Sequence, residues 1–469
     1  MTPGARLQTA IELLAEIGEG HGAADDVVGG FFRRHRFVGA KDRAAISEHI
    51  YSILRHRASI DWWIRRVNGN QQPDARQRLF ATLIMIEGWE PETVAKACDG
   101  DRFRPNPLGI LEQQVVKGLK GRSLIHPEMP RPVRLNYPEW LDPHWEALFG
   151  DKVDAEMAVM TETAPLDLRV NRLKGNRLDA RSALSNEGVE AMPTPLSPTG
   201  LRVYKRIPLA TLDVFKSGRI EVQDEGSQIA ALLALAKPGM RVVDFCAGAG
   251  GKTLALAAGM QNKGHLVACD ISAPRLERAV VRLRRAGVSN VERRPLTSER
   301  DKWVKRHAES FDRVFVDAPC TGTGTWRRNP DAKWRLRPLD LEELSVLQGS
   351  ILDSAARLVK PGGRLIYATC SMLPAENGGQ IQNFLASHPA FALLPIAQVW
   401  KDAIGTPCPV ETDTLQLTPA RHGTDGFFVA VMERRAPEPV AVVEGEAEPE
   451  TTEAAVPDEA AETPVVDAA

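Results

Sequence analysis

The stretch "MRVVDFCAGAGGKTLALAAGM", residues 240–260, passes from a short apolar strand through a glycine-rich loop into a helix. An ATPase phosphate-binding loop, G-x-x-x-x-G-K-[ST], requires a glycine at the position that Cys246 occupies here. A dinucleotide fingerprint, G-x-G-x-x-G, requires its third glycine where this chain has Thr253. The spacing therefore argues against both sites and predicts a different ligand for the loop.

Downstream of this loop, short apolar strands alternate with helical segments. The strands are expected in "MRVVDFC", "HLVACD", "NVERRPL", "FDRVFVDAP" and "GRLIYATC". This alternation is typical of an α/β fold with a parallel, doubly wound sheet, whose ligand crevice lies beyond the carboxyl ends of the strands. The last segment, "DTLQLTPARHGTDGFFVAVME", predicts two strands joined by a turn, an antiparallel hairpin that closes the sheet.

Acidic residues at two strand ends indicate what the crevice holds. Asp244 ends the first strand, and Asp270 ends the next one, twenty residues after Gly250. A carboxylate at this second position can accept hydrogen bonds from both ribose hydroxyls of a nucleoside. Because the glycine loop lacks a pyrophosphate fingerprint, these features together predict S-adenosylmethionine as the cofactor.

Two cysteines follow the ends of strands that are expected to be neighbours. Cys320 comes after "VDAP" and Cys370 after "YAT", so both should meet Asp317 beside the cofactor. Cytosine C5 is a poor nucleophile, but addition of a thiolate to C6 turns the ring into an enamine that accepts a methyl group. Asp317, protonated or hydrogen-bonded to N3, would offset the developing charge, and a second thiolate could remove the C5 proton.

The segment between the two cysteine strands, "PCTGTGTWRRNPDAKWR", carries basic and aromatic side chains in alternation. Gly322 and Gly324 would let it pass close to a substrate. The side chains predicted to contact phosphates and stacked bases are Trp326, Arg327, Arg328, Lys333, Trp334 and Arg335. We therefore expect this segment to lie on an RNA-binding surface.

The chain has four predicted parts. Residues 1–125 show only helical periodicity, residues 130–220 a small α+β pattern, and residues 221–434 the doubly wound pattern. In the helical part, "FFRRHRFVGAKDR" alternates arginines with aromatic residues, as RNA contact would need. Residues 435–469 are rich in Glu, Ala, Pro and Val and predict a disordered acidic tail.

Composition limits the class of protein. Over residues 1–434 there are 58 basic against 51 acidic residues, so the folded part is basic although the whole chain has a net charge of -2. There is no apolar run of membrane-spanning length and no signal peptide pattern, so we expect a cytoplasmic protein. Six cysteines without a C-x-x-C pair argue against a zinc site and a disulfide framework, and no metal is predicted.

At these motifs the sequence resembles the Sun/Nop family (rRNA small subunit methyltransferase B type) of RNA cytosine-C5 methyltransferases. The motifs that carry the resemblance are "QDEGSQ", "DFCAGAGGKT", "VDAPCTGTGTWRRNPDAKW" and "ATCSMLPAEN". "FVGAKDRAAISEHIYSILRHR" resembles the NusB-like helical RNA-binding domain that precedes the catalytic part in bacterial members. The resemblance implies a Rossmann-like class I methyltransferase sheet, preceded by a small α+β module and a NusB-like domain.

The family also implies roles for individual residues. Cys370 would attack C6, and Cys320 would promote breakdown of the covalent intermediate, with Asp317 between cofactor and target base. The loop that would hold the methionine part of the cofactor comprises Cys246, Ala247, Gly248, Ala249, Gly250, Gly251 and Lys252. The cofactor's ribose would lie on Asp270.

Two positions depart from the family pattern. The loop has Gly248-Ala249 where members commonly have Ala-Pro, and the third strand ends in Leu296 and Thr297 where an acidic residue near the adenine is common. The adenine contact is therefore unassigned. The leading hypothesis is 5-methylcytosine formation in 16S rRNA; the alternatives are a transfer RNA substrate and a non-catalytic RNA-binding assembly factor.

Overall fold

The strands predicted after residue 239 form one sheet in the computed structural model, which describes residues 1–20, 22–205 and 207–436. Its strands are β5 (Arg241–Asp244), β6 (His265–Asp270), β7 (Val291–Pro295), β8 (Phe311–Asp317), β9 (Val359–Thr369), β10 (Phe391–Leu393), β11 (Leu415–Leu417) and β12 (Phe427–Arg434). Their order is β10-β12-β9-β8-β5-β6-β7, with β11 paired to β12. Strands β5 to β9 pair in parallel, and β10, β11 and β12 pair antiparallel.

This arrangement confirms the predicted doubly wound sheet and its antiparallel closure. The short helix α20 (Pro419–His422) joins β11 to β12 where the sequence predicted a turn. The strands β8 and β9, which precede the two cysteines, are direct neighbours in the sheet, as expected.

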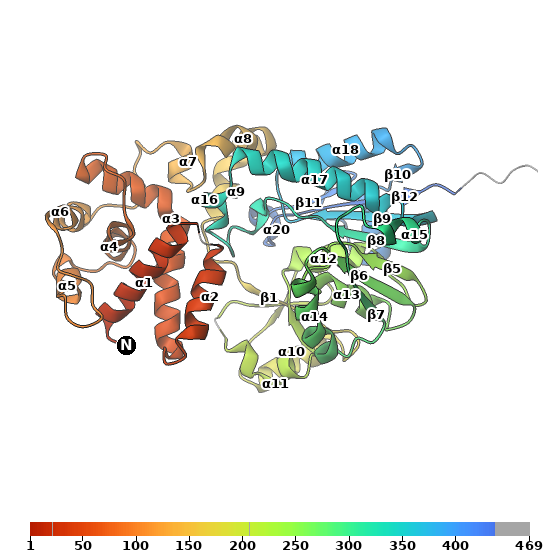
Figure 1. Cartoon of the computed structure of the whole chain (residues 1–469), viewed down its shortest axis with the longest axis horizontal. Helices are drawn as coiled ribbons and strands as arrows, with labels where there is room; N and C mark the ends of the chain where they lie inside the picture. Colours follow the sequence, from red (N-terminus) through yellow and green to blue (C-terminus); the bar gives the residue numbers. More distant parts are fainter. Residues whose placement is uncertain (21, 206, 437–469) are drawn as a thin grey trace, which may run out of the picture. The chain divides into compact units, whose positions relative to one another are not determined.

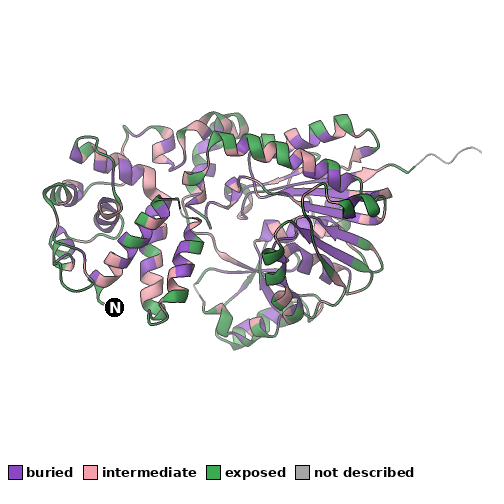
Figure 2. Ribbon diagram, viewed as in Figure 1, coloured by how far each residue is buried: buried purple, intermediate pink, exposed green. Residues whose placement is uncertain are grey.

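Alternate residues of the central strands face opposite layers of helices. The helices of this part are α12 (Glu225–Leu233), α13 (Gly251–Gly259), α14 (Ala273–Ala286), α15 (Lys302–Arg306), α16 (Ala332–Arg335), α17 (Pro338–Ala356), α18 (Gly378–Ser387) and α19 (Ile396–Ala403). Val243 and Val314 pack with α17 and α18, whereas Val242 and Phe315 pack with α12, α13 and α19. Figure 1 shows α17 and α18 above the sheet and α12 and α13 below it, and Figure 2 shows that the strands between them are buried.

A second, smaller sheet precedes the main one. Its strands are β1 (Leu166–Val170), β2 (Met192–Pro193), β3 (Gly200–Val203) and β4 (Ile220–Val222), in the antiparallel order β2-β3-β1-β4. Helices α10 (Arg177–Asn186) and α11 (Asp213–Lys216) pack on it through a core of its own. The strand expected over "LRVYKRI" is shorter than predicted: it ends at Val203, and the next residue, Tyr204, is exposed.

The N-terminal part is helical, as the sequence predicted. Its helices are α1 (Pro3–Gly18), α2 (Ala24–Arg34), α3 (Ala40–Asn68), α4 (Ala75–Met85), α5 (Pro91–Ala97) and α6 (Ile110–Leu119), followed by α7 (Arg131–Arg134), α8 (Asp142–Phe149) and α9 (Val153–Val159). No strand occurs in the described part of residues 1–125. Residues 437–469 of the predicted disordered tail lie outside the described residues, and the NusB-like character of the helices stays a prediction.

The turn after β8 is held between two other backbone segments. Gly324 donates its N–H to the Cys370 carbonyl, and Gly426 donates its N–H to the Gly324 carbonyl, both at 2.9 Å. A Cβ on Gly324 would lie 2.2 Å from the carbonyl oxygen of Gly426. Close backbone packing therefore requires a glycine at position 324, and the predicted approach of this segment to a substrate stays a prediction.

Substitution of Gly324 by Ala should destabilise the fold by about 1–3 kcal/mol, the usual cost of overpacking. Thermal unfolding of the Gly324→Ala protein should therefore begin several degrees below that of the parent. Gly378→Ala is the matched control, since no atom lies within 4 Å of a Cβ there. Equal unfolding temperatures for the two variants would contradict this packing argument.

Candidate functional site

The glycine loop and Asp270 form one hydrogen-bonded unit. The buried Asp270 carboxylate accepts the N–H of Gly248 at 2.7 Å and the N–H of Ser272 at 2.8 Å, one on each oxygen. Gly248 and Gly250 have φ values of 55° and 80°, in the left-handed region that favours glycine. Each oxygen of the Asp270 carboxylate keeps a lone pair that can accept one more hydrogen bond. The two hydroxyls of a ribose could donate these two hydrogen bonds.

Asp244 lies completely buried beneath this loop. Thr253 donates its hydroxyl to Asp244 Oδ2 at 2.6 Å, and Oδ1 has no partner among the described residues. Burial is the main cause that raises the pKa of Asp244 to about 7, and the charges of Asp317 and Asp270 add to it. The free oxygen of this acid is suited to a cationic or hydroxyl donor.

Lys252 and Asp317 form an ion pair of 2.7 Å at the end of β8. Burial alone would lower the pKa of Lys252, but the charge and hydrogen bond of Asp317 outweigh it and, with the nearby Cys370 sulfur, raise the pKa. The Lys252 ammonium also lies 5.0 Å from the centre of the Phe427 ring. Lys252 and Asp317 are thus held together at the end of the strand that precedes Cys320.

The two cysteine sulfurs lie 3.5 Å apart, on the turns that follow β8 and β9. The pKa of the Cys320 thiol is raised well above its usual value, first by the hydrogen bond to Cys370, then by burial and by the charges of Cys370 and Glu376. The structure thus brings together the two thiols that the sequence placed at neighbouring strand ends.

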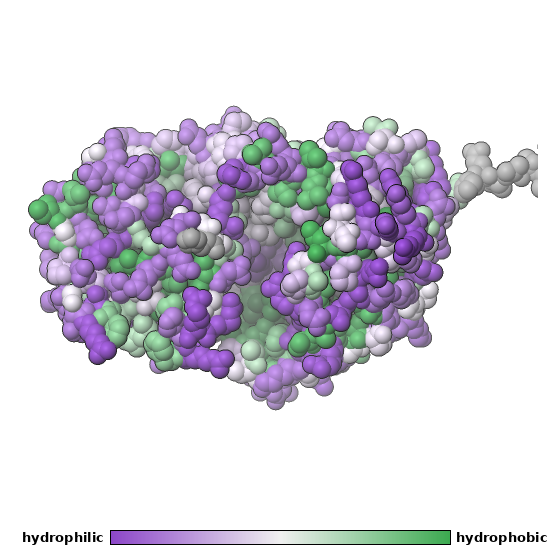
Figure 3. Space-filling model, viewed as in Figure 1, coloured by the Kyte–Doolittle hydropathy of each residue, from purple (hydrophilic) through white to green (hydrophobic). Residues whose placement is uncertain are grey.

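One cavity of about 310 Å³ contains both the proposed cofactor acids and the thiols. Its lining includes Cys246, Asp270, Asp317, Cys320 and Cys370. Of the other predicted cofactor residues, Ala247, Gly248, Ala249, Gly250, Gly251 and Lys252 form the loop beside it without being part of its lining. Figure 3 shows a hollow on the surface between helix α2 and the sheet.

Several cavity residues were not found by sequence reasoning. Ile271, Arg275 and Glu299 line the cavity together with Leu296, which occupies the position of the acid that is common in the family. Ile271 is 71% exposed although it is apolar. Its place directly after the ribose acid is the signal that could have identified it.

Glu376 is a further residue that the sequence analysis missed. Its fully buried carboxylate accepts the Thr321 N–H at 2.8 Å, the Thr321 hydroxyl at 2.5 Å and the Gln348 amide at 2.9 Å. Gln348 also donates to the Pro319 carbonyl at 2.9 Å. Glu376 therefore fixes the backbone on both sides of Cys320, and the available signal was its place in the "PAEN" motif.

The turn that carries Cys370 is fixed by a neighbouring set of contacts. Thr369 donates its hydroxyl to Asn377 Oδ1 at 2.6 Å, and the Asn377 amide donates to the Ser371 carbonyl at 2.9 Å. Thr323, from the turn of Cys320, accepts the Met372 N–H at 2.9 Å. The two cysteine turns thus share one buried polar network.

The RNA surface predicted between the two cysteines was wrong for three of its six residues, which are buried, while Arg328 and Trp334 are half-buried and Arg335 is exposed. Trp326, Arg327 and Lys333 have exposures of only 1%, 4% and 1%. Lys333 donates to the Arg55 carbonyl at 3.0 Å, and Trp334 donates its indole N–H to the Leu54 carbonyl at 2.6 Å. These donors satisfy carbonyls beside the kink of α3 at His56, so the segment is an internal contact with the helical part.

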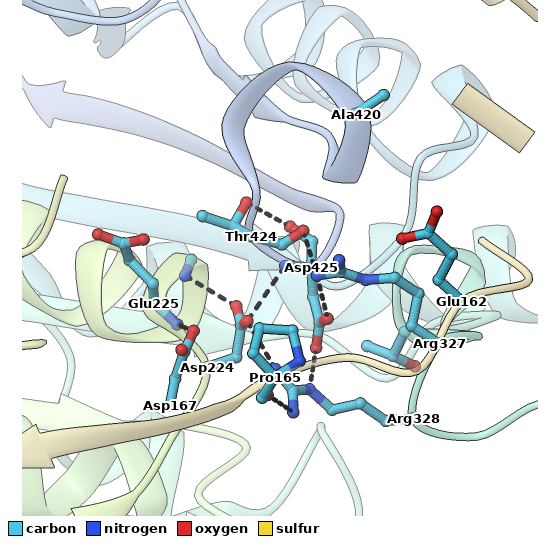
Figure 4. A network of polar contacts seen from close by, with 12 residues as sticks. Glu162, Pro165, Asp167, Asp224, Glu225, Arg327, Arg328, Ala420, Thr424 and Asp425 are labelled. Carbon is cyan, nitrogen blue, oxygen red and sulfur yellow. Dashed lines mark hydrogen bonds and ion pairs between the residues drawn. The ribbon is translucent and has the colours of Figure 1, made fainter. Parts of the chain in front are cut away.

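Arg328 is the centre of a second internal contact (Figure 4). It donates to Asp425 Oδ2 at 2.5 Å, to Asp224 Oδ2 at 3.0 Å and to the Pro165 carbonyl at 2.9 Å. Arg327 donates to the Thr424 carbonyl at 2.9 Å. The contact joins the small sheet, the "QDEGSQ" motif and the turn before β12 to the cysteine segment.

Within residues 1–20, 22–205 and 207–436, no group of three His, Cys, Asp or Glu side chains has a metal-binding arrangement. In the same described ranges, no helix combines the length and apolar character needed to cross a membrane.

Two family models match parts of this chain. A family model described as 16S rRNA methyltransferase RsmB/F matches residues 230–433, and a model for the ferredoxin-like domain of RsmF/B-like methyltransferases matches residues 137–210.

Two curated relatives cover most of the chain. The ribosomal RNA small subunit methyltransferase B of Klebsiella pneumoniae is 31% identical over 85% of this chain and 91% of its own length. A probable ribosomal RNA small subunit methyltransferase B of Synechocystis is 29% identical over 91% of this chain and 99% of its own length. Among solved structures, that of PH0851 matches with a TM-score of 0.77 and 29% identity over 92% of this chain and 99% of that chain.

If Glu376 acts as described, Glu376→Gln should speed alkylation of Cys320, because a negative charge that raises the thiol pKa is removed. Mass spectrometry of iodoacetamide-treated protein across pH 7 to 9 would measure this rate at each cysteine. Glu342→Gln, an exposed change on α17, should leave it unchanged. A slower or unaltered rate at Cys320 in Glu376→Gln would refute the electrostatic part of this assignment.

The raised pKa of Asp244 predicts a pH dependence of stability. In the unfolded chain this carboxyl ionises near pH 4, whereas in the folded protein it stays neutral until about pH 7. Stability is therefore lost as pH rises through this window, by at most about 4 kcal/mol. Asp244→Asn should raise the unfolding temperature relative to the parent more at pH 8 than at pH 5; the reverse order would contradict the burial argument.

Proposed function

The chain belongs to the RsmB/F family of rRNA small-subunit methyltransferases, and from that premise we propose that it forms 5-methylcytosine in 16S rRNA through a covalent adduct of Cys370. The observation that carries the proposal is the 3.5 Å separation of the Cys320 and Cys370 sulfurs beside the Lys252–Asp317 ion pair. Two thiols and an ion pair at one cavity are the groups that this chemistry needs.

The cofactor is S-adenosylmethionine, which supplies an electrophilic methyl group when bound. The residues fit it: Asp270 would accept the ribose hydroxyls, and Asp244 Oδ1, buried without a partner among the described residues, would accept a cationic or hydroxyl donor. Leu296 lines the cavity at the position where family members commonly have an acid, and its side chain offers the adenine no hydrogen-bond acceptor.

Cys370 is the proposed nucleophile. The positively charged Lys252 lies close enough to interact with the Cys370 sulfur, and the Cys320 sulfur lies 3.5 Å from it; in the proposed reaction Cys370 attacks as a thiolate. This thiolate forms the S–C6 bond while the C5=C6 electrons shift toward N3. The Lys252–Asp317 pair supplies the proton that N3 takes up, which leaves C5 nucleophilic toward the methyl group.

Cys320 is the proposed base that ends the reaction. Once Cys370 is bonded to C6, Cys320 loses the hydrogen bond that is the largest cause of its raised pKa, so its proton can pass to solvent. The resulting thiolate accepts the C5 proton, the C5=C6 bond re-forms, and Cys370 leaves with the electron pair of the S–C6 bond. The N3 proton returns to the Lys252–Asp317 pair.

The RNA would be held by parts beyond this cavity. We propose the helical residues 1–125 and the module of residues 130–220 as RNA-binding parts, with the catalytic domain over residues 221–434. The basic balance of residues 1–434 supports contact with a polyanion.

Mixing the protein with unmodified 16S rRNA and S-adenosylmethionine, followed by denaturing electrophoresis, tests the roles of the cysteines. Cys320→Ala should accumulate a covalent protein–RNA complex and slow turnover by about 10²–10⁴-fold, the usual contribution of a positioned base. Cys370→Ala should form no complex and transfer no methyl group.

Cys408→Ala is the control, because Cys408 is a free cysteine that does not line the cavity. A complex that forms with Cys370→Ala but not with Cys320→Ala would reverse the two roles. Methylation at an atom other than cytosine C5, read by nucleoside mass spectrometry, would overturn the proposed product.

A further inference from the structure

A second large cavity, of about 880 Å³, lies in the helical part and has no role in the reaction described above. We call it the Phe37–Phe103 pocket. Its lining includes Ile11, Phe31, His35, Phe37, Arg102 and Phe103. It is formed by α1, the end of α2 and the loop before α6.

Two large aromatic rings at this pocket are exposed to solvent. Phe37 is 77% exposed and Phe103 is 69% exposed, although neighbouring Phe31 packs against the helical core. Phe103 has a φ of 66°, a left-handed backbone conformation that is unfavourable for a bulky residue. A strained backbone that presents an apolar ring to water contributes nothing to folding, and such outliers concentrate at binding sites.

Both walls of the pocket are built for stacking. The Arg102 guanidinium lies 4.9 Å from the centre of the Phe103 ring. On the other side, His35 stacks on Phe31 at 4.1 Å and meets Phe37 edge-on at 5.8 Å. The rings therefore form platforms on which planar groups can stack.

The charge of Arg102 favours an anionic occupant. Arg102 lines the pocket, is exposed, and has no carboxylate partner among the described residues. Arg33, Arg34 and Arg36 are also exposed and lack a carboxylate partner there; they alternate in the chain with the lining residues Phe31, His35 and Phe37 without lining the pocket themselves. Arg104, by contrast, is paired with Asp99. Unpaired arginines beside exposed aromatic rings are the combination that binds phosphates and unpaired bases of single strands.

Helix α2 connects this pocket with the catalytic segment. At its start, the Ala24 N–H donates to Asp331 Oδ2 at 3.0 Å, within the segment that follows Cys320. At its other end, 11 residues or about 16 Å later, lie Phe31 and His35, which belong to the lining of the pocket. One helix thus contacts the catalytic segment at its start and the pocket at its end.

We propose that the Phe37–Phe103 pocket binds a single-stranded segment of the RNA substrate, with bases stacked on Phe37 and Phe103, one phosphate on Arg102, and the neighbouring phosphates on the exposed arginines of residues 33–36. The proposal rests on the RNA substrate of the proposed function and adds a binding site outside the reacting cavity. It also gives a role to the "FFRRHRF" stretch, residues 31–37, which the reaction does not use.

Binding of a fluorescein-labelled 12-nucleotide oligouridylate, measured by fluorescence anisotropy, tests this site. Phe37→Ala and Phe103→Gly should each weaken binding by about fivefold or more, as expected for loss of one stacking ring. Glycine at position 103 relieves the positive φ, so this variant should unfold no earlier than the parent. A 12-base-pair RNA duplex, whose bases are already stacked on each other, should bind the parent and both variants with the same affinity.

Ile110→Ala is the matched control, because Ile110 is 77% exposed in the same helical part but does not line the pocket. Oligouridylate binding by the combined Phe37→Ala, Phe103→Gly variant within twofold of the parent would overturn the proposal. The proposal would also be overturned if the variants bound oligouridylate as the parent does but no longer bound assembling small-subunit particles. That result would indicate that the pocket binds a protein. Oligouridylate binding involves no methyl transfer, so failure of the cytosine-C5 assignment would leave this result intact.

Discussion

The parallel pairing of β8 with β9 is the constraint on which the reactive geometry depends. In this register Asp317 faces Ala368, so Cys320, three residues beyond Asp317, and Cys370, two residues beyond Ala368, come to the same edge of the sheet. A slip of one residue would turn every side chain of the strand to the other face and separate the thiols. The apolar residues of β8 and β9, which pack on both faces of the sheet, prevent such a slip.

Pairing of the strands places the turns, but buried polar groups fix their shape. Irregular backbone inside a protein must find partners for its N–H and C=O groups. Glu376 and Gln348 supply them for the Cys320 turn, and Asn377 does so for the Cys370 turn. Glu376 also places a negative charge near Cys320, whereas Lys252, which is paired with Asp317 outside this network, interacts with Cys370. The two thiols therefore have different electrostatic surroundings.

The helical part is joined to the catalytic segment by more than chain connectivity. Lys333 and Trp334 donate to carbonyls at the kink of α3, and Asp331 accepts from the start of α2. Burial lowers the pKa of Lys333 to about 7, with the charge of Arg55 adding to this, so its interaction is chiefly with a backbone carbonyl. RNA that engages the helices would therefore act on a surface that is rigidly tied to the cysteine turns.

The sequence by itself determined the doubly wound sheet, the glycine loop, Asp270 and the two cysteines, because strand periodicity and motif spacing are local properties of the chain. It also predicted the helical character of the first 125 residues. It misjudged the segment from Trp326 to Arg335 because basic and aromatic residues have the same pattern whether they face RNA or another part of the protein. Glu376 and the Phe37–Phe103 pocket were decided only by the tertiary structure, since their roles arise from partners 55 and 66 residues away in the chain. Such long-range contacts leave no period or spacing in the sequence that could be read in advance.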